Sequence, residues 1–423
     1  MDTLMKVQMV LAFAALTAAS AFSAATVSKV AIHRNAGQDN VTVDYTLSGG
    51  KAVVTVDFLE NGDSIGAENF LTLGGDVNQL VEAGDHRIVW TCPERGGDLS
   101  GLSARVTAWP VDDPPDYMVI DFARACARRF YVSSNAIPGG VGAAVYKSSS
   151  LVMRKIPAKG VICRLGAPAG TENYYPNGQW TIDWRAKEQP HSVKFTDNYY
   201  LAIYETTQEQ YSRINGNGAV QNPTYPCADI SYNTLRGSKD DGIDWPDTLS
   251  TVKKGSVIDT LRNRTGLSTF DLPTEAEWEF ACRAGTVTSF NNGKNGASFH
   301  CALGDLGWDN SNASHGRHPV GEKLCNNWGL YDMHGNVCEL CLDWFDETLY
   351  KEDTGFDNPL EDPKGPKSSD AAAPTRRSMR SGQFEYGGNS CRSAARDSID
   401  PSQTNAGTKG AVGFRLKCAA RAE

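Results

Sequence analysis

The sequence predicts two folded domains, an all-β sandwich followed by a larger, loop-rich domain of mixed α and β structure. The chain has 423 residues, more than the roughly 100 to 200 that one hydrophobic core usually serves. Apolar and polar residues alternate up to about residue 110, as in strands with one buried face. Beyond residue 150, Gly, Asn, Asp and Ser recur and few segments have a helical pattern, so loops should dominate there.

The first domain is predicted from strands and turns. Residues 41–45 and 52–58 alternate with a period of two. Turn-forming pairs punctuate the region at intervals of roughly ten residues: Gly49-Gly50, Asn61-Gly62, Gly74-Gly75 and Gly96-Gly97. This spacing predicts a sandwich of immunoglobulin or fibronectin type over residues 25–110.

The boundary between the domains is predicted from proline. Pro114 and Pro115 cannot donate to a strand ladder, and they lie among acidic residues. We expect residues 111–117 to form an extended linker with few contacts, and the second domain to comprise residues 118–423.

The N-terminus has the pattern of an export signal. Lys6 supplies a positive charge, residues 7–18 are apolar, and small residues suited to cleavage follow. We therefore expect a signal peptide at residues 1–24 and a secreted or periplasmic mature protein. The apolar run is shorter than the ~20 residues that cross a bilayer, so no membrane span is expected.

Composition narrows the range of partners. With 40% hydrophobic and 22% charged residues, the chain resembles an ordinary globular protein. Its formal net charge is −9, without a block of Lys and Arg, so a phosphate backbone would be repelled. Nucleic acid is excluded as a partner on this ground.

The eleven cysteines indicate disulfides, because the chain is expected in an oxidising compartment. The number is odd, so at least one thiol is free or pairs between chains. Spacing alone leaves the connectivity open.

Two helix starts match the capping box, in which a Thr hydroxyl and a Glu three residues later satisfy backbone N–H groups. The pairs are Thr206 with Glu209 and Thr274 with Glu277. The second helix should end near Gly285, which suits a left-handed cap.

Six segments of the second domain form an ordered series. They are residues 195–200 (FTDNYY), 204–208 (YETTQ), 272–280 (LPTEAEWEF), 329–337 (GLYDMHGNV), 391–396 (CRSAAR) and 413–416 (GFRL). The series resembles the formylglycine-generating-enzyme, or sulfatase-modifying-factor, family over residues 151–416. The resemblance implies a modified C-type-lectin-like α+β fold that is rich in loops.

The family's founding activity is the oxidation of a sulfatase cysteine to formylglycine, with copper held by two cysteines upstream of an R-C-A-A-R motif. Aligning that motif on residues 392–396 puts Gln383 and Gly388 at the two cysteine positions. Copper(I) needs soft sulfur ligands, which neither residue supplies, so copper is not expected. Cys391 is a weak catalytic candidate as a displaced ligand; the alternative is half of a disulfide.

The resemblance also suggests a disulfide. In the enzyme resembled, a cysteine at the position of Cys282 bonds to the cysteine of R-C-A-A-R, which here is Ser393. Cys391 lies two residues away and is predicted to replace it as the partner of Cys282. Cys338 and Cys341 form a C-x-x-C, for which redox and zinc roles are both weak; Cys338 is expected to replace a packed aromatic residue.

A structural calcium ion is also implied by the resemblance. Its predicted ligands are the carboxylates of Asp332 and Glu339 and the backbone carbonyls of Gly335 and Val337. Oxygen-only ligation from a loop suits Ca²⁺. The alternative is a surface Asp332 and a Glu339 that faces a helix dipole.

Histidine metal sites are not expected. His315 and His318 form H-x-x-H, but they lie in a stretch that resembles a structural loop of the family.

Two functions compete. One is a non-catalytic binding module for an extracytoplasmic protein, peptide or glycan. The other is an enzyme of the same family that acts on a protein or small substrate with a different residue set. A reactive centre would distinguish them, and the sequence contains no G-x-S-x-G, phosphate-binding Gly loop or H-E-x-x-H.

Overall fold

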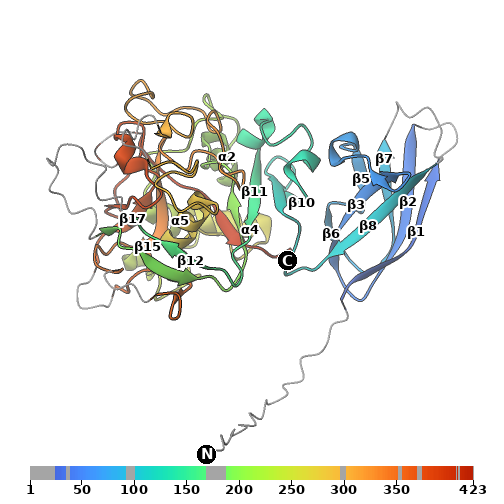
Figure 1. Ribbon diagram of the computed structural model, residues 1–423, viewed down its shortest axis with the longest axis horizontal. Coiled ribbons are helices and arrows are strands. Elements are labelled where there is room, and N and C mark those ends of the chain that lie inside the picture. Colours follow the sequence, from blue (N-terminus) through green and yellow to red (C-terminus); the bar gives the residue numbers. More distant parts are fainter. Residues whose placement is uncertain are drawn as a thin grey trace, which may run out of the picture.

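The computed structural model describes most of the chain. The described residues are 24–34, 39–91, 101–167, 187–295, 302–350, 355–368, 374–405, 407 and 410–422. The predicted signal peptide, residues 1–24, lies outside them except for its last residue. Within these ranges no helix has the length and apolar character needed to cross a membrane. Figure 1 shows the amino-terminal β structure beside a larger, loop-rich body.

The N-terminal region is all-β, as predicted, and contains two sheets. The first has the order β1 (Thr26–Arg34), β2 (Asn40–Ser48), β7 (Gly84–Thr91) and β5 (Leu73–Gly75). The second has β4 (Asp63–Ser64) and β6 (Gln79–Val81) on one side of β3 (Ala52–Glu60), and β8 (Leu102–Trp109) on the other. The short 3-10 helix η1 (Ala67–Asn69) lies between β4 and β5 in the chain.

The two sheets share one hydrophobic core. Alternate residues of β2, among them Val43 and Tyr45, face this core and are buried. At its centre the rings of Phe58 and Trp90, one from each sheet, lie 4.5 Å apart between centroids. The period-two pattern therefore identified the buried face of these strands correctly.

The segment between β8 and β9 (Tyr117–Asp121), for which an extended linker with few contacts was predicted, makes hydrogen bonds to residues distant in sequence. Lys155 Nζ donates to Asp113 Oδ1 at 2.9 Å and to the Pro114 carbonyl at 2.6 Å. The N–H of Ala422, near the C-terminus, donates to the Val111 carbonyl at 2.8 Å. These partners are distant in sequence, so the proline pattern could not reveal that the segment is docked.

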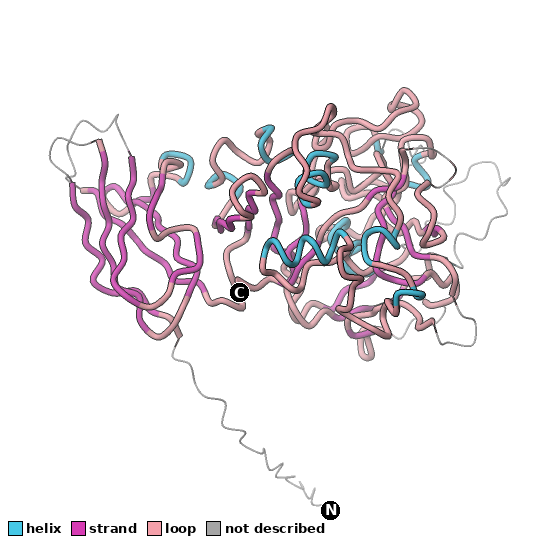
Figure 2. The backbone as a smooth tube through the Cα atoms, turned by 180° about the vertical axis from the view of Figure 1, so that it is seen from behind, coloured by secondary structure: helices cyan, strands magenta, loops and turns pink. Residues whose placement is uncertain are grey.

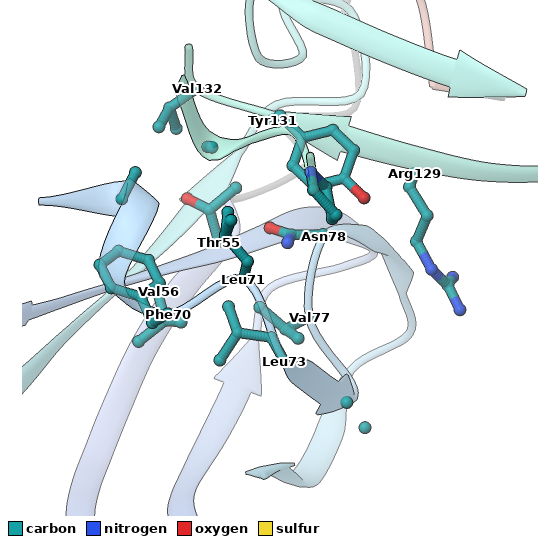
Figure 3. A pocket seen from close by; sticks show the side chains of 15 residues that line it. Thr55, Val56, Phe70, Leu71, Leu73, Val77, Asn78, Arg129, Tyr131 and Val132 are labelled. Atoms are coloured by element: carbon teal, nitrogen blue, oxygen red, sulfur yellow. The ribbon is translucent and has the colours of Figure 1, made fainter. Parts of the chain in front are cut away.

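Contacts also cross directly between the two regions. The N–H of Phe130, on β10 (Ala127–Tyr131), donates to the Asn78 carbonyl at 2.7 Å, and Arg129 binds the Gln79 side chain. Val53 of β3 belongs to the large region's core. A cavity of about 90 Å³ lies between the regions, lined by Phe70 and Leu73 on one side and Tyr131 on the other (Figure 3).

The large region contains three small sheets and short helices. The first sheet is antiparallel, in the order β10, β9, β11 (Ser150–Ile156), β14 (Tyr199–Ala202) and β20 (Lys417–Ala419). The second is β12 (Ile162–Leu165), β13 (His191–Lys194) and β16 (Leu360–Glu361). The third is β18 (Asp397–Ile399), β17 (Arg377–Arg380), β15 (Cys338–Trp344) and β19 (Val412–Gly413).

The α-helices of the described residues are α2 (Gln208–Ile214), α3 (Tyr232–Arg236), α4 (Val257–Thr265) and α5 (Glu275–Arg283). Short 3-10 helices occur at η3 (Ser134–Ala136), η4 (Ala144–Lys147), η6 (Lys239–Asp241) and η7 (Gly388–Cys391). Loops connect and surround these elements, as Figure 2 shows, so the loop-rich α+β prediction is confirmed.

One predicted helix cap is correct and the other is shifted. Helix α5 begins with the Thr274 and Glu277 capping box, and its left-handed C-terminal cap is Ala284, one residue before Gly285. The capping box of α2 consists of Thr207 and Gln210 instead of Thr206 and Glu209. Adjacent threonines made both registers possible in sequence; burial of Gln210, whose amide also binds the Ser150 carbonyl, selects the observed one.

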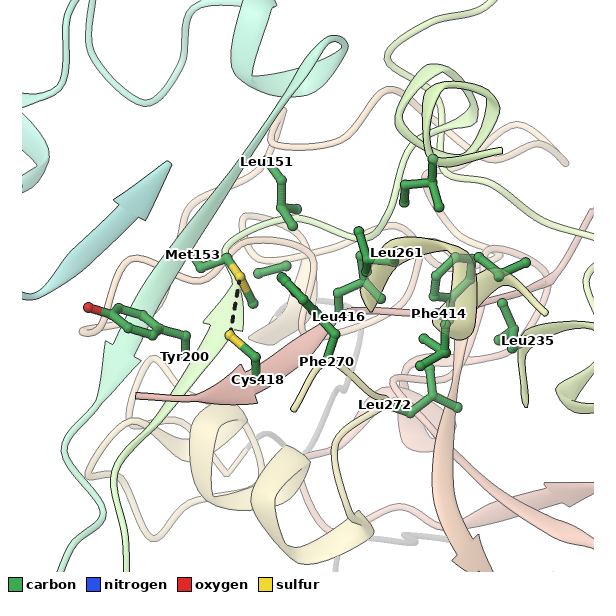
Figure 4. Close-up of a cluster of buried hydrophobic side chains, with 14 of the residues drawn as sticks. Leu151, Met153, Tyr200, Leu235, Leu261, Phe270, Leu272, Phe414, Leu416 and Cys418 are labelled. Carbon is green, nitrogen blue, oxygen red and sulfur yellow. Dashed lines mark hydrogen bonds between the residues drawn. The ribbon is translucent and has the colours of Figure 1, made fainter. Parts of the chain in front are cut away.

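The first sheet separates two hydrophobic clusters. Leu151 and Met153 of β11 point into the cluster around Leu261 and Phe414 (Figure 4). Val152, between them, points into the other, which includes the buried face of α5. The strand is therefore buried on both faces.

We predict that the docked segment resists proteolysis in the native protein, because its acidic residues are held by Lys155. Limited digestion with an Asp-directed protease should spare residues 111–116 in the parent. Lys155→Ala should expose them to cleavage, whereas Lys159→Ala, which removes an exposed lysine just after β11, should not. Equal cleavage of parent and Lys155→Ala, followed by mass spectrometry, would contradict this account.

Candidate functional site

The site region is organised by two glutamates of α5. Glu275 and Glu279 are one turn apart and share a face of the helix. Glu275 makes a bidentate pair with Arg396, at 2.7 Å for both bonds. Glu279 accepts from Arg380 at 2.6 Å and from Arg283 at 2.7 Å. All five side chains are buried, so the charges are compensated within the protein interior.

Electrostatics favours the ionised form of both glutamates. Burial alone would raise the pKa of each carboxyl group. Arg396 and Arg380 beside Glu275, and Arg283 and Arg380 beside Glu279, outweigh burial and bring both pKa values to about 2. These carboxylates are charge partners of the scaffold and carry no proton at neutral pH.

The same network fixes the loop that contains Gln383 and Gly388, the positions of the family's copper cysteines. Arg392 forms a bidentate pair with Glu188, at 2.6 and 2.8 Å, and Arg396 binds Glu275 four residues later. The segment 381–396 thus follows β17 directly and is anchored near its other end by Arg392 and Arg396. The arginines of the R-S-A-A-R segment therefore have structural partners.

At the two positions that the resemblance assigns to the family's copper cysteines, this chain has Gln383 and Gly388. Gln383 is fully buried, and neither amide atom makes a hydrogen bond with a described residue. Gly388 begins the 3-10 helix η7 and is also buried. The nearby Cys391 Sγ lies beside Gly382 and 3.9 Å from the Gly387 carbonyl oxygen.

Cys391 is a core thiol. It belongs to a small hydrophobic cluster with Phe290 and Leu303, and it is fully buried. Burial raises the pKa of this thiol above its ordinary value. The protonated form is favoured, which weakens the case for a nucleophile or a metal ligand.

The predicted disulfide between Cys282 and Cys391 is not formed. All nine cysteines of the described residues are unbonded. Cys282 Sγ lies 3.6 Å from Ser393 Oγ, the residue at the family's cysteine position. His334 contacts both residues: its Nε2 lies 3.8 Å from Cys282 Sγ, and its Nδ1 lies 2.7 Å from the Cys391 carbonyl oxygen. Cys391 is the last residue of η7, and it is Ser393, two residues beyond that helix, whose side chain reaches Cys282, so Cys391 does not substitute for the missing partner.

The C-x-x-C segment is not a redox or zinc site. Cys338 and Cys341 lie on strand β15, three residues apart, so they point to opposite faces. Cys338 packs into the cluster around Leu261, and Cys341 into the cluster on the other face. Their core positions agree with the prediction that Cys338 is a packed residue.

Glu339 anchors a second buried ion pair. Its Oε1 accepts from Arg415 at 2.7 Å, and its Oε2 accepts from Trp278 Nε1 of α5 at 2.6 Å. Asp332 is buried as well, so the alternative of a surface aspartate is wrong. Asp332 Oδ2 accepts from the N–H of Gly321 at 2.7 Å, whereas Oδ1 has no hydrogen-bond donor among the described residues.

The predicted calcium ligands all lie between Asp332 and Glu339, but they differ in whether their oxygens already accept hydrogen bonds. The Gly335 carbonyl accepts from Ser381 Oγ at 2.9 Å, and Glu339 is held by Arg415. The free lone pairs of Asp332 Oδ1 fit a cation. No group of three or more His, Cys, Asp or Glu in the described part of the chain is arranged to share a metal ion, so the set depends on backbone carbonyls.

Sequence reasoning missed Glu205, a third buried carboxyl group near Asp332 and Glu339. Glu205 is buried; its Oε2 accepts from Asn336 Nδ2 at 2.6 Å and its Oε1 from the N–H of Val337 at 3.1 Å. Burial and the nearby Asp332 raise its pKa well above the ordinary value. The sequence signal for Glu205 was its place inside the 204–208 segment. That segment was instead interpreted only as the start of a helix.

The H-x-x-H pair does not converge. His315 is exposed, whereas His318 stacks on Trp308 with centroids 3.6 Å apart and directs Nε2 to the Ala313 carbonyl at 3.1 Å. His334 is buried, which lowers its pKa to about 4 and keeps it neutral. His318 and His334 therefore have structural surroundings, and His315 is exposed.

Comparison with known proteins agrees with this architecture. Residues 168–420, more than half of the chain, match the model of the sulfatase-modifying factor enzyme 1-like domain. The chain belongs to this family. It is 34% identical over 155 residues to the formylglycine-generating enzyme of Streptomyces coelicolor, covering 34% of this chain and 45% of that protein.

Two further relatives have other names. The chaperone protein LppX of Paenibacillus barcinonensis is 27% identical over 186 residues, covering 37% of this chain and 66% of that protein. Treponema denticola variable protein 1, a solved structure, is 22% identical with a TM-score of 0.46, covering 64% of this chain and 95% of that one. The chain thus spans less than two thirds of the length of the Streptomyces and Paenibacillus proteins, two curated relatives.

The sulfatase-modifying-factor-like domain matches from residue 168, yet its first sheet needs earlier residues. Strands β9, β10 and β11 precede the matched range; β10 pairs with β9, β9 with β11, and β11 with β14. The folded domain is therefore larger than the matched segment.

We predict that the α5 ion pairs contribute strongly to stability. Arg396→Met leaves Glu275 without its bidentate partner, and breaking a buried pair on one side costs about 3–5 kcal/mol. Urea denaturation should show this loss. Lys194→Met, which breaks the exposed pair with Glu361, should cost less than about 1 kcal/mol. Similar losses in the two variants would contradict the assigned importance of the network.

The same pairs should make folding sensitive to acid. The folded pKa of Glu275 and Glu279 is about 2, below an unfolded value of about 4.3. Their contribution should therefore be present above about pH 4.3 and be lost as the pH falls from there towards 2. The fall should be smaller in Arg396→Met.

Proposed function

We propose that this chain is an extracytoplasmic binding protein of the sulfatase-modifying-factor family that does not oxidise cysteine. The observation that carries the proposal is the chemistry of residues 383–391. Gln383 and Gly388 occupy the positions that the family resemblance assigns to the copper cysteines, and both are buried without a sulfur atom in their place.

The remaining thiol does not supply the missing chemistry. A site for Cu(I) requires soft thiolate ligands, and an amide or a bare backbone provides none. Cys391 is one thiol where two are needed, and burial keeps it protonated. Cys282 is also buried, and burial raises its pKa to about 12.

The scaffold around this region is intact, which supports binding as the retained role. The anchored loops of the family domain give a preorganised surface for a protein, peptide or glycan. The name of one relative, a chaperone protein, supports a family role other than oxidation. An immunoglobulin or fibronectin type of sandwich, and export through residues 1–24, belong to the same proposal.

We also propose a structural calcium ion at Asp332, Glu339, Gly335 and Val337. The support is Asp332 Oδ1, a buried oxygen without a donor among the described residues. Glu339 is engaged by Arg415 and Trp278, but a carboxylate has about four lone-pair sites and can also face a cation. When bound, the ion would neutralise a cluster whose carboxylates outnumber Arg415.

We predict that calcium raises the melting temperature of the parent protein. At about 100 times its dissociation constant it would add about 2.7 kcal/mol to the free energy of unfolding. Asp332→Asn should remove the response, since the amide replaces one ligand oxygen charge. Glu322→Gln, at a more exposed carboxylate nearby, should keep it. A calcium response that survives in Asp332→Asn would eliminate the proposed site.

We predict that the purified protein leaves a sulfatase-type C-x-P-x-R peptide unchanged in the presence of copper and oxygen. Conversion to formylglycine lowers the peptide mass by about 18 units, and mass spectrometry would detect it. A formylglycine-generating enzyme run in parallel is the positive control. The reaction needs a thiolate pair to hold copper, which is absent at residues 383 and 388.

Loss of that mass with the parent, abolished by Cys391→Ser, would return the chain to the enzymes of the family. Restoring cysteines at positions 383 and 388 tests the scaffold separately. Activity in that double variant alone would support the assigned register.

A further inference from the structure

A second cavity lies in the large region, at one end of β15 and β17 beside α3 and η6. Its volume is about 270 Å³. It is bounded by Asn233, Lys239, Trp344, Thr375, Arg377 and Pro401. None of these residues belongs to the predicted copper, calcium or disulfide positions.

Arg377 forms the buried side of this cavity. Its side chain is only 2% exposed, and its guanidinium carbon lies 3.4 Å from the Trp344 ring centroid and 4.1 Å from that of Tyr232. One terminal nitrogen donates to the Leu342 carbonyl at 2.8 Å. Its Nε has no partner among the described residues.

The charge of Arg377 is incompletely balanced. The nearest carboxylate, that of Asp244, lies 3.9 Å away, beyond hydrogen-bond distance. Both oxygens of Asp244 already accept hydrogen bonds, from Trp344 Nε1 at 2.9 Å and from Ser368 Oγ. Burial consequently lowers the pKa of Arg377 to about 10.

Lys239 adds a second positive charge at the more open side. Its side chain is 43% exposed, and its Nζ lies 4.6 Å from the Trp344 ring centroid. The nearest carboxylate is again Asp244, at 3.8 Å. Two cations therefore share one carboxylate to which neither is hydrogen-bonded. Asp240 is the one acidic residue among those that line the cavity, so the lining residues alone sum to one positive charge, which the shared Asp244 beside them offsets only across gaps of 3.8 and 3.9 Å.

The rest of the lining sets the size and character of a ligand. Trp344, Pro374 and Pro401 provide apolar surface, while Asn233, Ser238 and Thr375 provide polar groups. A cavity of this volume is small by the standard of ligand pockets and suits a molecule of one sugar or one amino acid. Arginine's planar fork is well suited to a carboxylate.

We propose that this cavity binds a small carboxylate-bearing molecule, either a hexuronic acid or an acidic amino acid, with its carboxylate between Lys239 and Arg377. The inference goes beyond the proposed function. It holds even if the chain oxidises cysteine, because its residues lie outside the segment 383–391.

Calorimetric titration of the full mature chain tests the proposal, with D-glucuronate and L-glutamate as separate probes. We expect saturable binding of one of them at millimolar concentration or tighter, weakened by added salt, and none of neutral glucose. The probe that binds identifies the source of the carboxylate.

Variants locate the binding. Lys239→Ala should weaken it about fivefold or more, the effect of removing one partly exposed charge. Lys194→Ala removes a lysine of similar exposure, 39%, from another surface and should leave affinity unchanged. Arg377→Lys, which keeps the charge and loses the fork, should also weaken binding; if it fails to fold, Lys239→Ala still decides. No binding of either carboxylate, equal binding of glucose, or equal affinity of Lys239→Ala and the parent would overturn the proposal.

Discussion

The structure of the large region depends on a buried network of charges around α5. Glu275 and Glu279 can be buried only because Arg380, Arg396 and Arg283 meet them at hydrogen-bond distance. Arg283 belongs to α5 itself, whereas Arg380 comes from β17 and Arg396 from the segment after it, so pairing the two glutamates determines where those segments lie. Helix α5 is therefore fixed by charge as well as by hydrophobic burial.

This constraint explains what the family motifs represent. The segment 272–280 supplies the carboxylates, and the segment 391–396 supplies an arginine partner. Trp278 of the same helix binds Glu339, which in turn holds Arg415 of the segment 413–416. Each of these motifs thus supplies one partner of a buried contact with a distant segment of the scaffold. A chain can keep all of them while the loop between β17 and Arg392 carries no thiolate pair.

The junction between the two regions has a related consequence. Lys155 and the C-terminal Ala422 hold the segment after β8, and Phe130 bonds to the N-terminal region. The N-terminal β structure is thus attached to the large region by hydrogen bonds at several points as well as by the chain itself (Figure 1). A ligand bound by the large region would meet a surface of fixed geometry.

The sequence alone determined the properties that depend on neighbouring residues. Period-two alternation identified β2 and β3, the Thr274 and Glu277 spacing identified the start of α5, and residues 383 and 388 are simply not cysteines. Tertiary structure decided the rest: the partners of Glu275, the contacts of Glu205, the docking of the proline segment, and the lack of a bond between Cys282 and Cys391. Those outcomes depend on which side chains meet across distant segments in a desolvated interior, where direction and distance set the energy, and sequence spacing specifies neither.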